Sequence, residues 1–141
     1  MLDKLVTSLR LMGADEVYDT TFAADMTVME ETAEFLRRME AGGPFQMFTS
    51  CCPAWIRYLE HEDPKYLKHI STCKSPMQMF AALLRAKPDE SDKKLYHIAI
   101  MPCTAKKMEA GRSEFTHDGQ PDVDLVLTTQ EVIQMIKEAG I

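Results

Sequence analysis

Apolar residues recur at helical spacing in several stretches of the chain. Five of them mark the first stretch: Leu2, Leu5, Val6, Leu9 and Met12. Charged and polar residues interrupt this run, so the pattern predicts an amphipathic surface helix over residues 1–12 and not a continuous apolar segment. A second broad apolar stripe predicts a helix over residues 26–40.

Residues that begin or end helices mark the limits of other elements. Pro53 and Pro76 each fit the first turn of a helix, where the missing N–H has no intrahelical partner to lose. The first of these helices follows Pro53, and the second runs through Arg85. Thr128 and Glu131 form the capping-box pattern of a final helix, and Gly13 fits the end of the first.

Short apolar runs between these helices predict strands over residues 16–20, 45–50, 96–101 and 124–128. Polar stretches predict loops over residues 88–94 and 111–122. Alternation of strands and helices implies an α/β fold, with about four mainly parallel strands flanked by helices in three layers. The length of 141 residues fits one such unit, spanning residues 1–141.

Composition narrows the classes of function. The formal net charge is −6 and is spread along the chain, which argues against a nucleic-acid-binding face. No stretch approaches the roughly 20 apolar residues needed to cross a bilayer. We therefore expect no nucleic-acid partner, no membrane partner and a cytoplasmic location.

Four cysteines are the candidate chemistry of the sequence. Cys51 and Cys52 follow one predicted strand, and Cys103 follows another. Parallel sheets bind ligands beyond the carboxyl ends of their strands, and a helix N-terminus favours a thiolate. The spacing excludes the common zinc patterns, and the four histidines are scattered, so the residues alone indicate a soft-metal or redox site of open identity.

Two longer motifs identify a resemblance. Residues 49–55 read T-S-C-C-P-A-W and residues 101–109 read M-P-C-T-A-K-K-M-E. They resemble, in order, two signatures of the iron-only (FeFe) hydrogenases, and similarity to that family extends over nearly the whole chain. The resemblance implies that the chain is one lobe of the catalytic domain of such an enzyme.

The resemblance implies a composite iron–sulfur cofactor, the H-cluster, in which a 4Fe-4S cubane is joined to a di-iron unit. Cys52 and Cys103 match two of the four cubane ligands. The other two belong to a C-x-x-x-C signature that this sequence does not contain. The isolated chain is therefore expected to be inactive and to have no bound cluster, and the remaining lobe of the same hydrogenase is its expected partner.

The resemblance also implies a proton relay. Cys51 matches the cysteine that exchanges protons with the cofactor, and the rest of the relay matches Glu31, Ser71, Glu34 and Arg38. Judged from spacing alone, Glu34 and Arg38 would form an ordinary surface ion pair on one helix face.

The resemblance also implies which residues line the cofactor pocket. Lys106 matches a lysine that holds a cyanide ligand, while Met101 and Ser75 match residues that line the di-iron pocket. Ser75 also suits a helix cap. Met77 departs from the family, in which many members have a glutamine, and Cys73 matches no ligand, so we interpret it as a structural thiol.

The expected activity of the parent protein is reversible oxidation of H2 and reduction of protons. Ferredoxin or another carrier would exchange electrons with it. The alternatives are a hydrogenase-like iron–sulfur assembly protein or a hydrogen sensor, neither of which turns over hydrogen. A dithiol redox protein is a weaker alternative.

Overall fold

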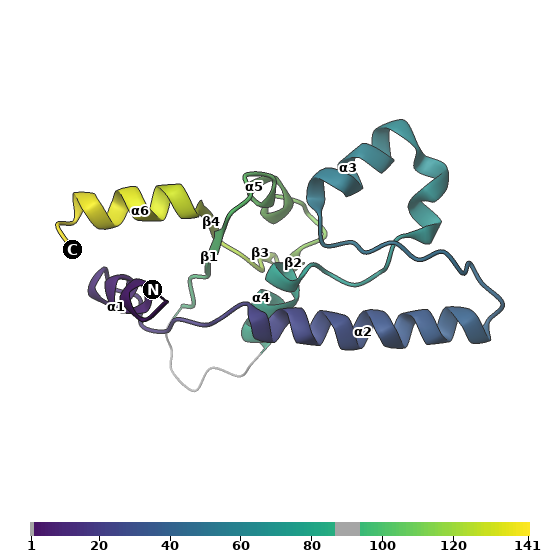
Figure 1. Ribbon diagram of the computed structural model, residues 1–141, viewed down its shortest axis with the longest axis horizontal. Helices are drawn as coiled ribbons and strands as arrows, with labels where there is room; N and C mark the ends of the chain where they lie inside the picture. The colour runs from purple at the N-terminus through teal and green to yellow at the C-terminus, as the bar shows by residue number, and fades with distance from the viewer. Residues whose placement is uncertain (1, 87–93) are drawn as a thin grey trace.

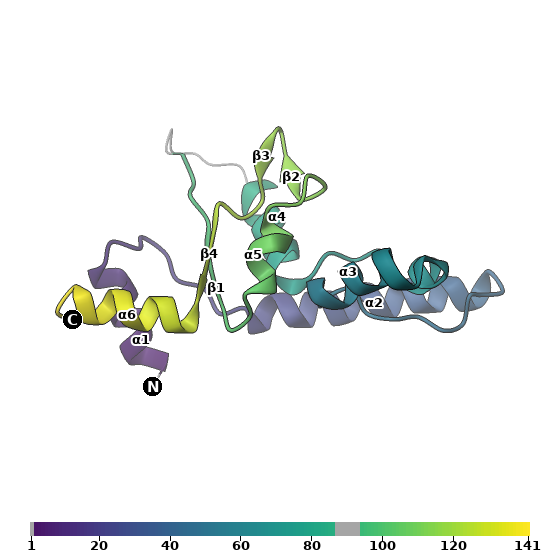
Figure 2. The ribbon, with the colours of Figure 1, turned by 90° about the horizontal axis from the view of Figure 1, so that it is seen from above.

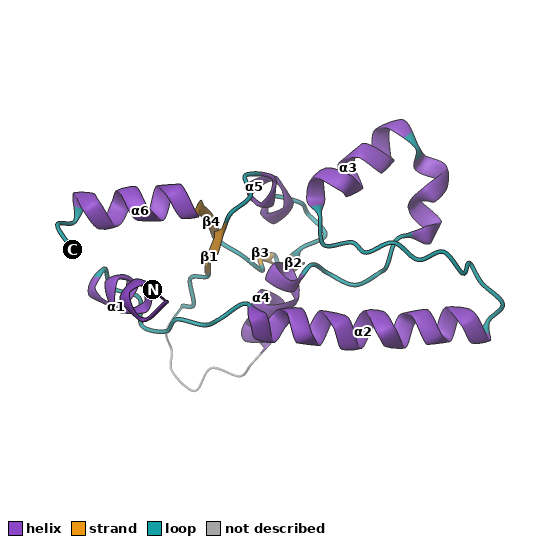
Figure 3. Cartoon of the chain, in the orientation of Figure 1, coloured by secondary structure: helices purple, strands orange, loops and turns teal. Residues whose placement is uncertain are grey.

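The computed structural model describes residues 2–86 and 94–141 (Figure 1). Its α-helices are α1 (Leu2–Leu11), α2 (Thr21–Glu40), α3 (Pro53–Glu62), α4 (Pro76–Ala86), α5 (Ala105–Ala110) and α6 (Thr129–Glu138), with a 3-10 helix, η1, at Pro64–His69. Its strands are β1 (Ile98–Met101), β2 (Thr116–His117), β3 (Gln120–Pro121) and β4 (Leu125–Thr128). Figure 3 shows that helices and loops dominate the molecule.

The parallel sheet consists of β1 and β4, in register from Ile98 opposite Leu125 to Met101 opposite Thr128. β2 and β3 form a separate antiparallel hairpin. Its two turn residues, Asp118 and Gly119, have φ values of 50° and 75°, as a two-residue hairpin turn requires. The α/β class is thus confirmed, and the stretch expected to be a loop over residues 111–122 contains this hairpin.

The described residues contain four strands, as expected in number, but they are not mainly parallel: only β1 and β4 pair in parallel, and β2 and β3 form the antiparallel hairpin. In the described part of the chain, residues 16–20 form no strand, and residues 45–50 contribute a single parallel bridge between Phe48 and Ile70. The physical reason is that a strand needs a neighbour to pair with, and a short apolar run does not reveal whether one is present. Of the expected loop over residues 88–94, all but Lys94 lies outside the described residues.

The helix predicted over residues 26–40 begins earlier, at Thr21. The Asp19 carboxylate accepts hydrogen bonds from the Thr21 backbone N–H (2.9 Å) and hydroxyl (2.7 Å), so it satisfies an otherwise free helix donor. The added turn brings Ala23 into the buried face of α2, which also contains Thr27 and Glu34 and packs on α4. The large apolar side chains that predict this helix are instead exposed, namely Val28, Met29, Phe35, Leu36 and Met39.

The buried core is small and lies between α4 and the parallel sheet. Met77 and Ala81 of α4 pack with Val123 and Val126, and Met101 lies against this cluster. Viewed from above, α2 and α3 extend to one side of the sheet, while α1, α6 and both termini lie at the other (Figure 2). Many large apolar side chains are consequently exposed, among them Phe22, Val28, Met29 and Leu36.

Among the described helices, none has the length and apolar character needed to cross a bilayer.

Candidate functional site

Two cysteine-bearing segments meet where α3 and α5 pack together. Cys52 is the N-cap of α3, with an extended backbone at φ −99° and ψ 106°, and Pro53 occupies the first helical turn as predicted. Cys103 follows the end of β1 and precedes α5. The thiols of Cys51, Cys52 and Cys103 are free and exposed. Only Cys103 follows a strand of the sheet, because the segment before Cys51 makes one bridge instead of a strand.

Lys106 joins the two segments. Its Nζ donates to the backbone oxygen of Cys51 at 2.8 Å and forms an ion pair with Glu109 Oε2 at 2.8 Å. The Lys106 side chain is 12% exposed and that of Glu109 is 4% exposed, so both charges are largely removed from water. A buried ammonium held by a carboxylate and a carbonyl fixes the backbone of Cys51 relative to α5.

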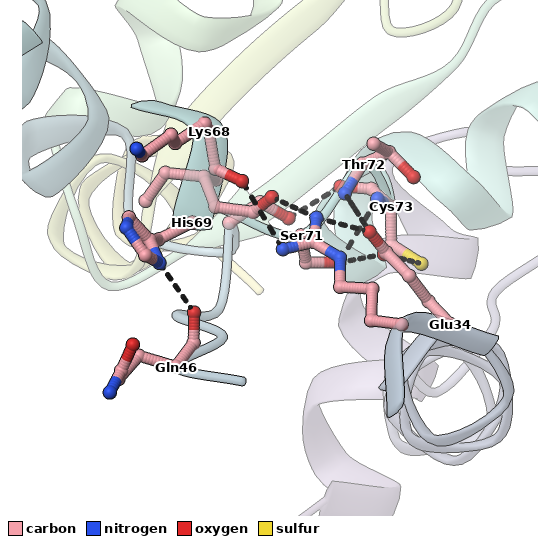
Figure 4. A network of polar contacts seen from close by, with 10 residues as sticks. Glu34, Gln46, Lys68, His69, Ser71, Thr72 and Cys73 are labelled. Carbon is pink, nitrogen blue, oxygen red and sulfur yellow. Dashed lines mark hydrogen bonds and ion pairs between the residues drawn. The ribbon is translucent and has the colours of Figure 1, made fainter. Parts of the chain in front are cut away.

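Glu34 is the centre of a buried polar network (Figure 4). Its Oε1 pairs with Arg38 Nη2 at 2.5 Å, and its Oε2 accepts a hydrogen bond from the Ser71 hydroxyl at 2.8 Å. The backbone N–H of Thr72 donates to both oxygens, at 3.2 Å and 3.0 Å. Glu34 is 6% exposed. The interpretation of Glu34 and Arg38 as an ordinary surface pair is therefore wrong, because the loop after Ile70 covers them.

Cys73 connects this network to the first cysteine motif. Its backbone N–H donates to the Ser71 hydroxyl oxygen at 3.1 Å, and its thiol lies 3.8 Å from Glu34 Oε2. The Ser50 hydroxyl donates to the Cys73 carbonyl. Since Ser50 precedes Cys51, the network around Glu34 is tied to the segment that carries the exposed thiols. Sequence reasoning missed Ser50 and Thr72, whose roles depend on partners far away in the chain.

Glu31 and Cys51 are not joined by a direct hydrogen bond within the described residues. The Oε1 atom of Glu31 is buried without a partner there, and the Cys51 thiol has Thr49 Oγ1 at 3.9 Å. The structure therefore brings together Glu34, Ser71 and Arg38 by direct contact. It leaves Glu31 and Cys51 outside that contact network.

The two other pocket candidates have clear structural roles. Ser75 is 1% exposed, and its hydroxyl oxygen lies 3.4 Å from the Gln78 backbone nitrogen, so it caps α4 as predicted. Met101 is partly buried against the core cluster at the end of β1. Both residues are fixed in place.

The pKa of Glu34 lies below its ordinary value of 4.5. Burial acts in the opposite direction and raises it, but the hydrogen bonds from Ser71, Arg38 and Thr72 together outweigh burial. The carboxylate form therefore stabilises the fold above about pH 4.5, and this contribution is lost as the pH falls through the lowered pKa.

We expect Glu34→Gln to be less stable than the unmodified chain at neutral pH, with the difference shrinking in acid. The amide keeps the size of the side chain but lacks the charge that Arg38 neutralises. Thermal unfolding of both proteins at about pH 7 and about pH 3.5 measures the difference. A difference that stays constant with pH would show that the ionised carboxylate does not provide the stabilisation.

The exposed thiols suit metals that bind sulfur ligands, including the iron of iron–sulfur clusters, but they are an incomplete ligand set for such a cluster. A 4Fe-4S cluster is held by four thiolates. Residues 2–86 and 94–141 contain no group of three or more cysteine, histidine or acidic side chains arranged to hold a metal ion. Cys52 and Cys103 would supply two of the four thiolates that such a cluster needs.

Comparison with known proteins agrees with the motifs. The family model described as "Iron only hydrogenase large subunit, C-terminal domain" matches residues 1–141. The chain is 45% identical to iron hydrogenase 1 of Clostridium pasteurianum, covering 98% of this chain and 25% of the relative. It is 43% identical to the periplasmic Fe hydrogenase large subunit of Nitratidesulfovibrio vulgaris, covering 98% of this chain and 34% of that relative.

Similarity extends to assembly proteins and to solved structures. The chain is 37% identical to the cytosolic iron-sulfur assembly component 3 of Bos taurus, covering 98% of this chain and 31% of the relative. A solved FeFe-hydrogenase structure, described as showing stepwise H-cluster assembly, matches with a TM-score of 0.91 and 43% identity, over 97% of this chain and 35% of that one. The chain thus spans about a quarter to a third of the relatives it matches.

Proposed function

The chain belongs to the iron-only hydrogenase large-subunit family, and from this premise we propose that it forms one lobe of an enzyme that interconverts H2 with protons and electrons. In this proposal, residues 1–141 form a single lobe that supplies part of the proton path and half of the cluster ligands. The remaining lobe of the same protein completes the site.

The buried contact of Glu34 with Ser71 and Arg38 is the observation that carries the proposal. On a solvated helix face Glu34 and Arg38 would pair with each other but stay exposed and would have no contact with Ser71, which lies 37 residues away in the chain. Instead, two titratable groups and a hydroxyl lie in direct contact, and Cys73 and Ser50 connect them to the Cys51 segment. Hydrogen-bonded carboxylate and hydroxyl groups are the kind of chain that carries protons through a protein interior.

Each remaining residue has a role that its contacts support. Cys51 presents an exposed thiol able to give and take a proton. Glu31, whose Oε1 atom is buried and has no hydrogen-bond partner among residues 2–86 and 94–141, is the proposed acceptor between Cys51 and the network at Glu34. Ser75, just before α4, and Met101, at the end of β1, would line the pocket.

Cys52 and Cys103 would hold the cubane of the H-cluster, and Lys106 would present its ammonium to an anionic ligand of the di-iron unit. The H-cluster would supply the redox chemistry and bind hydrogen. The chain's own part is to anchor the cluster, orient it through the Lys106 contact with Cys51, and move protons away from it.

Partners and location follow as further proposals. Ferredoxin or another electron carrier would exchange electrons with the complete protein. We propose a cytoplasmic location, while one relative at 43% identity is named as periplasmic.

Replacing Cys103 in the full-length polypeptide tests the ligand assignment. We expect Cys103→Ala to take up less iron and sulfide than the unmodified polypeptide in anaerobic reconstitution, because a thiolate ligand is lost. Bound iron per polypeptide and the visible absorbance of the cluster are the measurements. Cys73→Ala is the matched control, since Cys73 is partly buried and is not a proposed ligand. Equal iron uptake by Cys103→Ala and the unmodified polypeptide would remove Cys103 from the ligand set.

An iron–sulfur assembly role is the second candidate, favoured by the 37% identity to an assembly component over nearly the whole chain. The two candidates differ in turnover. Hydrogen evolution by the full-length polypeptide, after maturation with the complete cofactor, supports the enzyme. A polypeptide that holds its cubane but evolves no hydrogen supports the assembly role or a hydrogen sensor.

A further inference from the structure

The loop over residues 71–75 carries Ser71 and Ser75 but belongs to no regular element. It links Ile70 to the start of α4. Two of its anchors have been described: Glu34 binds its first residues, and Ser50 binds the carbonyl of Cys73. A third anchor is the side chain of Lys74, which reaches away from this network toward the connection between β3 and β4.

Lys74 Nζ lies 2.6 Å from Oδ2 of Asp122, whose side chain is completely buried. The second carboxylate oxygen, Oδ1, is also buried and has no hydrogen-bond partner within the described residues. A buried carboxylate that loses its counter-charge is strongly destabilising. Lys74 is the cation that the structure pairs with Asp122, and its side chain remains 35% exposed.

The backbone holds Asp122 in place independently of Lys74. Its N–H donates to the carbonyl of Phe115 at 2.9 Å, and its carbonyl lies 2.9 Å from Nδ1 of the His97 ring. The following residue, Val123, belongs to the hydrophobic core. Asp122 is therefore held by its own backbone contacts, and the Lys74 side chain connects the loop over residues 71–75 to it.

We propose that the pair of Lys74 and Asp122 is a positioning device that holds the loop over residues 71–75 so that the Ser71 hydroxyl and the Thr72 N–H stay on Glu34. The contact from Ser71 to Glu34 is 2.8 Å long, and a hydrogen bond is lost once the two oxygens separate much beyond its normal range. Small loop displacements would therefore open the network. This role deepens the proposed function, because it rests on the Glu34 network being part of the proton path.

Three variants of the 141-residue chain test the proposal: Lys74→Met, the double variant Lys74→Met/Asp122→Leu, and the control Lys65→Met. Lys74→Met should lower the melting temperature by about 10 °C, because it leaves the Asp122 charge unpaired in the interior. The double variant removes both charges and should recover most of that loss, since apolar replacements of a buried pair are often tolerated. Lys65 forms an exposed pair with Asp63, so its replacement should leave the melting temperature within about 1 °C.

The decisive readout is the state of Glu34, measured by carbon-13 NMR of its carboxyl group and by the amide signal of Thr72. We expect the pKa of Glu34 to rise in the double variant, and the Thr72 amide signal to shift, even though stability has recovered. A double variant with unmodified Glu34 and Thr72 signals would overturn the proposal and leave the pair a purely stabilising one. If the double variant does not fold, Lys74→Met/Asp122→Asn replaces it. This variant removes both charges and the Lys74 donor but keeps the shape of residue 122, and unmodified signals there overturn the proposal equally.

These measurements require neither iron nor turnover. A failure of the cluster assignment would appear in the iron uptake of Cys103→Ala and would leave the Glu34 readout untouched. A failure of the positioning role would appear only at Glu34 and Thr72.

Discussion

Cys51→Ala is expected to lower hydrogen turnover by the full-length polypeptide by about 100-fold or more, the range usual for loss of a general acid–base group. The thiol of Cys51 is exposed beside the proposed cluster ligand Cys52, and it lies 3.9 Å from Thr49 Oγ1. Alanine removes the exchangeable proton without adding bulk. The rate of hydrogen evolution with a chemical reductant is the measurement.

The control for this variant is cluster content. Because Cys51 is not a proposed ligand, Cys51→Ala should bind as much iron as the unmodified polypeptide and show the same visible absorbance. Loss of iron together with activity would make Cys51 a ligand and contradict the division of roles between the two adjacent cysteines. Full turnover in Cys51→Ala would contradict the relay.

Lys106→Met is expected to lower the free energy of unfolding of the chain by about 3–5 kcal/mol, the usual effect of removing one partner of a buried ion pair. Glu109, with a side chain 4% exposed, would lose its counter-charge, and the carbonyl of Cys51 would lose its donor. Methionine keeps the length and apolar stem of lysine, so the result reports on the ammonium. Urea unfolding followed by circular dichroism measures the change.

Lys107→Met is the matched control for Lys106→Met. It is the next residue on α5, but it pairs with Glu131 at the surface, where the two side chains are 41% and 45% exposed. Its replacement should change the free energy of unfolding by at most about 1 kcal/mol. Equal effects of the two variants would show that burial of Lys106 and Glu109 contributes nothing to stability.

Features that depend on neighbouring residues could be predicted from the sequence. Pro53 begins α3, Ser75 caps α4, and Thr128 with Glu131 forms the complete capping box of α6, each as expected. These helix starts can be predicted because the hydrogen-bond donor and acceptor lie within four residues of each other. The two cysteine motifs are equally local, and the family match bears them out.

Features that depend on distant partners could not be predicted in the same way. A short apolar run does not state which strand will lie beside it, so residues 16–20 and 45–50 were expected to join a sheet that in fact pairs β1 with β4. The side of α2 that carries Glu34 and Arg38 looks solvated in sequence because the loop that buries it comes more than 30 residues later.

The sequence by itself therefore determined the starts of α3, α4 and α6, the α/β class and the family, because short-range hydrogen bonds and compact motifs set them. Only the tertiary structure decided that Glu34 is buried under Ser71 and Thr72, that Cys73 and Ser50 link it to the cysteine motif, and that Asp122 is neutralised by Lys74. Each of these contacts joins segments that chain folding must first bring together. Burial then makes them strong, since polar groups removed from water must find partners within the protein.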